Sequence, residues 1–252
     1  MDNNLFLLMV LHTFVANAKM DTIMKKIYLL IAIALPFVLI SCGDDKDEPM
    51  PLDNHEFVDL GLPSGTLWAT CNIGANNPEE YGDYFAWGET HTKDTYDWNT
   101  YKLGGYDRIG NFYLMKYCTN SNFGPFDDKT ELDSEDDAAY ANWGPLWRMP
   151  SYDQIEELYN YCTWQWTQRN GVNGQLGTGP NGASLFLPVA GYYWEGVLNK
   201  AGSGGYYWSR TLSQALCEGA YFLGFDSEHK YDWHINGRAF GHTVRAVRAP
   251  KK

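Results

Sequence analysis

The run Glu135-Asp-Asp-Ala-Ala-Tyr-Ala-Asn-Trp-Gly144 continues through Trp147-Arg-Met-Pro-Ser151 into a helix-like stretch over 151–158, and this region decides the fold. Ser151 can cap that helix, because its hydroxyl can accept a bond from an early backbone N–H, and acidic residues follow in the first turns. One face of the helix is apolar and carries Ile155, Leu158 and Tyr159. We therefore predict a helix that begins directly after Ser151.

Short runs of apolar and aromatic residues lie on both sides of this region and predict strands. They cover 56–60, 67–73, 83–87, 184–190, 206–209, 220–225, 230–235 and 243–248. Residues 88–130 and 170–182 are polar and rich in glycine, which predicts long loops. Few helices and many short strands indicate one α+β or mainly-β domain from about residue 55 to residue 252.

The N-terminal region has the pattern of an export signal. Met24-Lys-Lys26 is basic, and residues 27–40 are an apolar run that is shorter than the roughly 20 residues of a membrane span. The run ends in Leu39-Ile-Ser-Cys42, which resembles a bacterial lipobox with Cys42 as the site of lipid attachment. We predict a signal peptide over 1–41 with translation starting at Met24; an uncleaved anchor helix or a longer basic region are the alternatives.

Residues 42–54 are acidic and polar, and they predict a lipidated tether rather than packed structure. The stretch Gly43-Asp-Asp-Lys-Asp-Glu-Pro49 resembles the export signal of surface lipoproteins of Bacteroidetes, and a plain solvated linker is the alternative. We expect an outer-membrane lipoprotein exposed at the cell surface, which contacts the membrane through its lipid anchor only.

The charge of the chain argues against two classes of partner. Lys and Arg number 19 and Asp and Glu number 31, which gives a net charge of −12. A nucleic-acid-binding protein needs a basic face to neutralise phosphates, and anionic membrane surfaces attract basic proteins. We therefore expect no nucleic-acid partner.

The region quoted first resembles part of the formylglycine-generating (sulfatase-modifying) family, and a closer similarity is to the Fibrobacter major paralogous domain family of Bacteroidetes surface lipoproteins. The segments that carry this similarity lie at 58–72, 86–90, 147–150, 205–209 and 244–248. The resemblance implies a single C-type-lectin-like α+β domain with few short helices, mixed or antiparallel short strands and long loops. It implies no settled activity, since fold does not fix function.

Cysteine and carboxylate patterns give little support for an enzyme. The formylglycine-generating enzymes use a close cysteine pair near the C-terminus, where this chain has only Cys217. No nucleophile, phosphate-binding or metalloprotease motif is present. His229 and His234 are five residues apart, and we interpret them as surface residues rather than metal ligands. We expect a non-catalytic protein, with a surface glycan-acting hydrolase as the alternative.

Two further features leave alternatives open. Cys71, Cys118, Cys162 and Cys217 allow three disulfide pairings, and four buried thiols fit the sequence equally well. The acidic stretch 127–137 offers oxygen ligands for calcium, although it lacks the spacing of an EF-hand, and a solvated loop before a helix is the simpler interpretation. No other metal or cofactor is expected.

Recognition is the function that the composition favours. Aromatics make up 16% of the chain, and the segment 210–241 mixes bulky aromatic and donor-rich side chains. We predict a binding surface on the exposed face of a C-terminal sheet, formed by Arg210, His229, Tyr231, Trp233, His234 and Arg238. An unknown glycan or protein is the expected ligand, and local cations point to an anionic one. Tyr221, Leu223 and Phe225 alternate and should face the core.

Two other interpretations of the same segment remain. Framework-like stretches at 205–209 and 244–248 bracket it, which is the arrangement of proteins whose C-terminal patch is rewritten by a diversity-generating retroelement. The other interpretation is that the protein is a structural surface protein without a specific ligand. The hypothesis to test is a surface lipoprotein that acts in ligand recognition or adhesion.

Overall fold

The fold is described from a computed structural model, which covers residues 54–228 and 232–249. The description concerns the compact unit within residues 52–252. The predicted signal peptide, Cys42 and all of the tether before Asn54 therefore lie outside the described residues. Within the described ranges, no helix is both long and apolar enough to cross a membrane.

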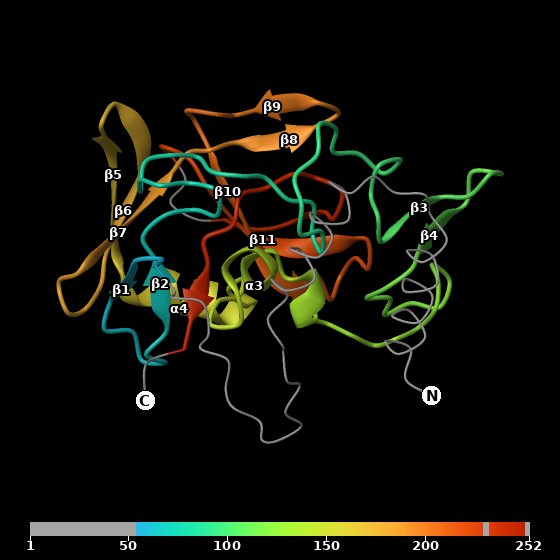
Figure 1. The fold of residues 1–252 in the computed structure, drawn as a ribbon, viewed down its shortest axis with the longest axis horizontal. Helices are drawn as coiled ribbons and strands as arrows, with labels where there is room; N and C mark the ends of the chain where they lie inside the picture. Colours follow the sequence, from blue (N-terminus) through green and yellow to red (C-terminus); the bar gives the residue numbers. More distant parts are fainter. Residues whose placement is uncertain (1–53, 229–231, 250–252) are drawn as a thin grey trace, which may run out of the picture. The chain divides into compact units, whose positions relative to one another are not determined.

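Three small sheets and two hairpins form the framework of the unit (Figure 1). The first sheet contains β1 (Phe57–Asp59), β2 (Leu67–Ala69) and β13 (Val247–Arg248). The second contains β5 (Thr163–Arg169), β6 (Val172–Thr178) and β7 (Ser184–Pro188). The third contains β10 (Gly205–Leu212), β11 (Gly219–Phe225) and β12 (Asp232–Gly237). The hairpins are β3 (Gly104–Tyr106) with β4 (Phe112–Leu114), and β8 (Tyr192–Trp194) with β9 (Val197–Asn199).

All of these strand pairs are antiparallel. Between β4 and β5 the chain forms the 3-10 turn η1 (Ser134–Asp136) and the helices α3 (Ala138–Trp143) and α4 (Tyr152–Tyr161). The described unit is thus a small α+β fold of short antiparallel strands with two α-helices.

The predicted helix is confirmed as α4, which begins directly after its N-cap residue Ser151. Ser151 and Gln154 form a capping box at the start of α4, in which each side chain binds the backbone N–H of the other. Ile155 and Leu158 are buried. The link 148–150 lies between α3 and α4. Asp137 caps α3 by accepting hydrogen bonds from Ala139 N and Tyr140 N.

Several predicted elements differ from the structure. The stretch 170–182 is not a loop, because β6 occupies most of it and pairs with β5 through a tight turn at Asn170 and Gly171, both of positive φ. The stretch 83–87, predicted as a strand, forms a single β-bridge, between Phe85 and His242. The stretch 88–130, predicted as long loops, contains the hairpin of β3 and β4. Val247 and Arg248 pair with β2, so the last strand lies outside the sheet of β10–β12.

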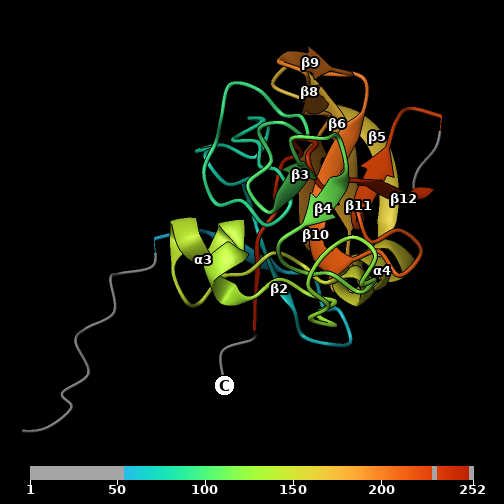
Figure 2. The same cartoon turned by 90° about the vertical axis from the view of Figure 1, so that its right-hand side faces the viewer.

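The pair β10–β11 separates two hydrophobic clusters, with α4 below it in Figure 2. Tyr207, Leu223 and Phe225 pack on the side of α4, with Ile155 and Leu158. Trp208 and Phe222 pack on the other side, in a cluster that includes Trp87 and Trp147. Alternation along both strands produces this division. Leu223 and Phe225 are buried as predicted, whereas Tyr221 is half-buried at the rim.

Candidate functional site

A pocket of about 440 Å³ opens where α4 begins beside β10 and β11. Its volume is in the range of small-ligand sites, roughly 300–1,000 Å³. Four separate segments supply its wall: the stretch before η1, the start of α4, the end of β10 with the loop after it, and β11. The lining residues are Glu131, Ser151, Tyr152, Asp153, Thr211, Gln214 and Tyr221. We call this the α4–β10 pocket.

The start of α4 is capped within its own first turn and is held against β10 by two hydrogen bonds, one of which runs from Arg210 N to Pro150 O at 2.9 Å. Ser151 accepts a bond from Gln154 N at 3.2 Å, and Tyr152 N donates to Thr211 Oγ1 at 3.0 Å. Thr211 in turn donates to Glu131 Oε1 at 3.4 Å. These contacts hold the Tyr152 ring and the Asp153 carboxylate at the mouth of the pocket.

Glu131 reaches the pocket because its segment pairs briefly with β10. Leu132 N donates to Arg210 O at 3.0 Å, and Leu212 N donates to Thr130 O at 2.8 Å. Across this short ladder Arg210 Nη2 forms an ion pair with Glu131 Oε2. The Glu131 carboxylate is therefore oriented and its charge is balanced by a half-buried guanidinium.

Two tyrosines form the aromatic part of the wall. The rings of Tyr152 and Tyr221 lie 4.7 Å apart between centroids and are tilted by 53°. Desolvation, followed by the charge of Glu156, raises the pKa of Tyr152, so its hydroxyl remains a donor at neutral pH. Aromatic faces beside carboxylate, amide and hydroxyl groups suit a ligand with an apolar face and hydroxyl edges, such as a sugar ring.

Of the six predicted binding residues, only Arg210 and Arg238 have described side chains, so the predicted surface as a whole stays a prediction. Arg210 is half-buried and borders the pocket through Glu131. His229 and Tyr231 lie outside the described residues. Trp233 and His234 are in β12, opposite Leu223 and Phe222, and only their backbone is described.

Arg238 is fully buried, so its predicted exposure is wrong. Its guanidinium donates to three backbone carbonyls, those of Lys116 at 3.1 Å, Tyr117 at 2.5 Å and Cys217. It also lies over the ring of Trp87, 5.1 Å from the centroid. This arginine stabilises loops of the core and is not available to a ligand.

Sequence reasoning missed most of the pocket. Tyr152 and Asp153 were interpreted only as the start of a helix, and Glu131 only as part of an acidic loop. Thr211 and Gln214 carry no sequence signal of their own. The one informative signal was Arg210, which contacts the pocket wall through Glu131, whereas Arg238, the other predicted residue with a described side chain, does not line the pocket.

The acidic stretch forms ion pairs with a lysine. Carboxylate oxygens of Asp133, Glu135 and Asp136 lie within 4.8 Å of one another, close enough to share a cation. Lys116 Nζ lies among them, at 2.9 Å, 2.7 Å and 2.6 Å from these three groups. The ammonium group supplies the positive charge that a calcium ion would bring, so this geometry does not favour the calcium hypothesis.

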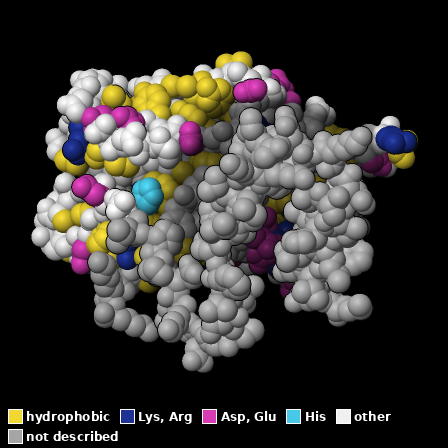
Figure 3. Space-filling model, in the orientation of Figure 1, with side chains coloured by type: hydrophobic (Ala, Val, Ile, Leu, Met, Phe, Trp, Pro, Cys, Tyr) yellow, Lys and Arg dark blue, Asp and Glu magenta, His cyan; other side chains and the backbone are white. Residues whose placement is uncertain are grey.

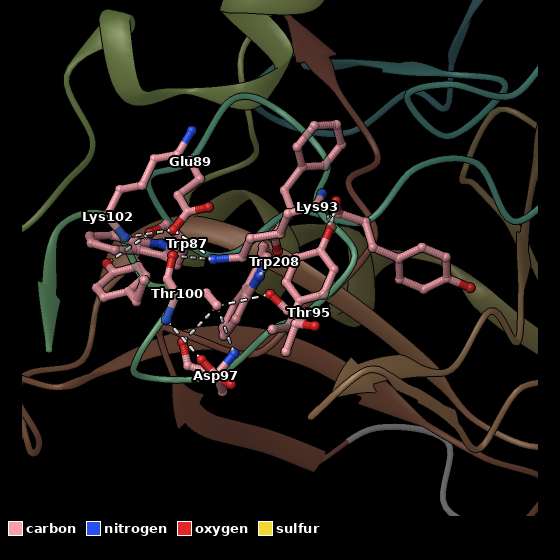
Figure 4. Close-up of polar contacts among 12 residues, drawn as sticks. Trp87, Glu89, Lys93, Thr95, Asp97, Thr100, Lys102 and Trp208 are labelled. Atoms are coloured by element: carbon pink, nitrogen blue, oxygen red, sulfur yellow. Dashed lines mark hydrogen bonds and ion pairs between the residues drawn. The ribbon is translucent and has the colours of Figure 1, made fainter.

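The stretch 86–90, which carries part of the family resemblance, is buried around Trp87 and Glu89 (Figure 4). Trp87 Nε1 donates to Ser209 O at 2.9 Å, and Glu89 Oε1 accepts from Lys93 Nζ at 2.9 Å and Lys102 N at 2.8 Å. These contacts close the loop that follows Glu89. The motif therefore stabilises the fold and forms no part of the pocket.

A second surface feature is apolar and lies over β8 and β9, at the top of Figure 3. Val197 and Leu198 are exposed there, at 58% and 37%. Trp194 stacks on Phe240 with 3.9 Å between ring centroids. This hairpin lacks the convergent polar groups that the α4–β10 pocket has.

Comparison of the chain with models of known families, with curated proteins and with solved structures found no match. The assignment of a site therefore depends on the geometry of the chain itself.

Proposed function

We propose that this chain is a cell-surface lipoprotein whose folded unit recognises a glycan in the α4–β10 pocket. The observation that carries the proposal is the pair Tyr152 and Tyr221 beside the oxygens of Glu131 and Asp153. A tyrosine face can cover the apolar face of a sugar ring, and carboxylates accept bonds from its hydroxyls.

The ligand we propose is neutral rather than anionic. The earlier expectation of an anionic ligand depended on exposed cations near the C-terminus, but Arg238 is buried and Arg210 is paired with Glu131. Asp153 adds a negative charge at the mouth of the pocket. An acidic glycan would meet repulsion there, whereas neutral hydroxyl groups would find acceptors.

The proposed location and fold family have separate support. The lipobox at Cys42 supports lipid attachment, and the acidic tether supports display at the cell surface. Short antiparallel strands, long loops and the Arg148-Met-Pro150 link between two helices support a C-type-lectin-like domain of the Fibrobacter major paralogous type. The hypothesis of a rewritten C-terminal patch places variation in 210–241, and this segment contains three lining residues of the pocket.

A glycan hydrolase is the second candidate, because two carboxylates, Glu131 and Asp153, line one pocket. Hydrolysis of a glycosidic bond needs one group that donates a proton and one that acts as nucleophile or base. Glu131 accepts hydrogen bonds from both Arg210 and Thr211, an arrangement that suits a fixed acceptor. We therefore propose recognition without turnover.

Binding of the detergent-solubilised full chain to an array of neutral and acidic glycans tests the proposal. We expect binding to neutral glycans, and we expect Tyr152→Ala to weaken it about 30-fold or more, since truncation of a buried contact aromatic typically costs about 2 kcal/mol. The matched control is Tyr161→Ala, at the other end of α4, where the side chain is 53% exposed. It should bind like the natural chain.

Three outcomes would contradict the proposal. They are binding to acidic glycans alone, equal affinity of the Tyr152→Ala variant, and absence of binding to every glycan. Release of new reducing ends from a bound glycan would support the hydrolase instead. A thermal melt of each variant shows that the change in affinity does not come from unfolding.

A further inference from the structure

Two of the four cysteines among the described residues share one small hydrophobic cluster. Cys118 and Cys217 are both buried and pack with Leu114, and Phe112 and Phe123 cover them. Cys118 follows β4, and Cys217 lies in the loop between β10 and β11, so they are about 100 residues apart in the sequence. Cys118 Sγ is 3.0 Å from Asn120 O, and Cys217 Sγ is 3.3 Å from Glu218 Oε2.

Arg238 holds the backbones of the two cysteine segments together. Its Nη2 donates both to Tyr117 O and to Cys217 O, and its Nη1 donates to Lys116 O. One nitrogen thus binds the residue before Cys118 and Cys217 itself. A disulfide requires the two backbones to approach closely, and this clamp provides that approach.

The other two cysteines lie in different surroundings. Cys71 follows β2, where its sulfur is 3.7 Å from Thr70 Oγ1. Cys162 is the residue that ends α4 and packs against the cluster of Ile155 and Leu158. Neither belongs to the cluster of Cys118 and Cys217.

We propose that Cys118 and Cys217 form the disulfide of this protein when the chain meets a disulfide oxidant, such as an exported thiol oxidase. In this exchange the two thiols lose two protons and two electrons and form one S–S bond. The oxidant's disulfide is reduced to two thiols and takes up the same protons and electrons.

The crosslink would act on the loop between β10 and β11. That loop carries Gln214, which lines the α4–β10 pocket, and Ser213 braces it through Ala215 N and Leu216 N. Joining Cys217 to the segment after β4 would fix the far end of this loop. The effect of the crosslink on the ligand site rests on the proposed function, whereas the pairing of Cys118 with Cys217 does not.

Peptide mapping without reductant tests the pairing. The full chain in detergent is reduced, treated with oxidised glutathione, blocked with an alkylating reagent and digested. We expect one linked pair of peptides that contains Cys118 and Cys217, with Cys71 and Cys162 alkylated. The double variant Cys71→Ser/Cys162→Ser should keep the crosslink, and Cys217→Ser should lose it. Oxidation should raise Tm by about 5–15 °C in both the natural chain and the double variant.

A different pairing, or alkylation of both Cys118 and Cys217 after oxidant treatment, would overturn the inference. The peptide map of the natural chain alone decides the pairing, so a serine variant that fails to fold does not affect the test. Protein isolated from cells separates the two proposals. A crosslink that forms with glutathione but is missing from the cellular protein supports the pairing and contradicts export.

Discussion

Arg238 shows how a residue's environment can reverse its sequence-based interpretation, and Arg245 lies in a similar environment. Arg238 and Arg245 are both fully buried, and each donates to backbone carbonyls from distant segments. Arg245 also donates from Nε to Asn72 Oδ1 at 2.8 Å. Hydropathy places arginine at the surface, because a buried cation needs several acceptors. The acceptors here lie up to 176 residues away, so only the fold reveals them.

Arg238→Met should destabilise the unit rather than weaken a surface contact. The change leaves the carbonyls of Lys116, Tyr117 and Cys217 without their donor inside the core. Each unsatisfied buried group costs about 1–3 kcal/mol, so we expect a loss of about 3 kcal/mol or more in the free energy of unfolding. Chemical denaturation measures it. Arg108→Met, at an exposed position, serves as the control, and similar losses in both variants would refute this role for Arg238.

His242 should make stability depend on pH. Burial holds its pKa well below the ordinary value of 6.5, and its ring stacks on Trp208 at 3.9 Å. The unfolded chain takes up a proton below about pH 6.5 while the folded chain does not, so stability falls as pH falls through that range. The slope from this group is about 1.4 kcal/mol per pH unit.

The measurement is the free energy of unfolding at pH 7 and at pH 5.5. The natural chain should lose about 1 kcal/mol more than His242→Phe, which keeps an aromatic ring against Trp208 but cannot titrate. His91→Gln, at an exposed histidine, should behave like the natural chain. Parallel pH curves for the natural chain and His242→Phe would show that His242 does not contribute.

At the scale of elements, the sequence predicted features that depend on neighbouring residues, such as a helix cap. It did not predict features that depend on close packing between strands. Ser151 and Gln154 satisfy each other within one turn, so the start of α4 could be predicted. The hairpin of β5 and β6 was missed because its glycines suggested a loop. Gly174 and Gly177 are in fact required where β6 passes the rings of Phe186 and Trp164. The alternation of Trp164 and Trp166 is a strand-like pattern in the sequence that could have identified β5.

Gly177→Ala tests this account of the β5–β6 hairpin. A Cβ at this position would meet the Trp164 ring at 2.6 Å, and the ring is buried, so it cannot move away freely. We expect a loss of about 1–3 kcal/mol in the free energy of unfolding, as for other overpacked sites. Ser184→Ala on β7, opposite Thr178, is exposed and should change stability by less than about 0.5 kcal/mol. Unchanged stability in Gly177→Ala would mean that the glycine serves no packing role.

For the whole molecule, composition correctly indicated an α+β unit but gave no indication of the site. The α4–β10 pocket combines Glu131, Tyr152, Thr211 and Tyr221 from segments far apart in the chain, so no spacing pattern could reveal it. The net charge of −12 is little changed at the surface, because the described unit buries Glu89 and Asp137 as well as Arg238, Arg245 and Arg248.

The proposed attachment to a membrane concerns the whole chain and would depend on Cys42, which lies outside the described residues. Cys42→Ala should leave the signal peptide uncleaved and the protein without lipid, because the thiol is the acceptor that the lipobox presents at the end of the apolar run 27–40. Metabolic labelling with a fatty-acid analogue, together with partitioning into detergent, measures both effects.

Cys71→Ala is the matched control, since it removes a cysteine of the folded unit and should leave labelling and cleavage intact. The folded unit is acidic, so electrostatic attraction to anionic lipids cannot replace the anchor. The Cys42→Ala chain, once solubilised, should therefore fail to bind vesicles of anionic lipid. A Cys42→Ala chain that is still cleaved and acylated would exclude the lipobox, and with it the surface location on which glycan recognition outside the cell depends.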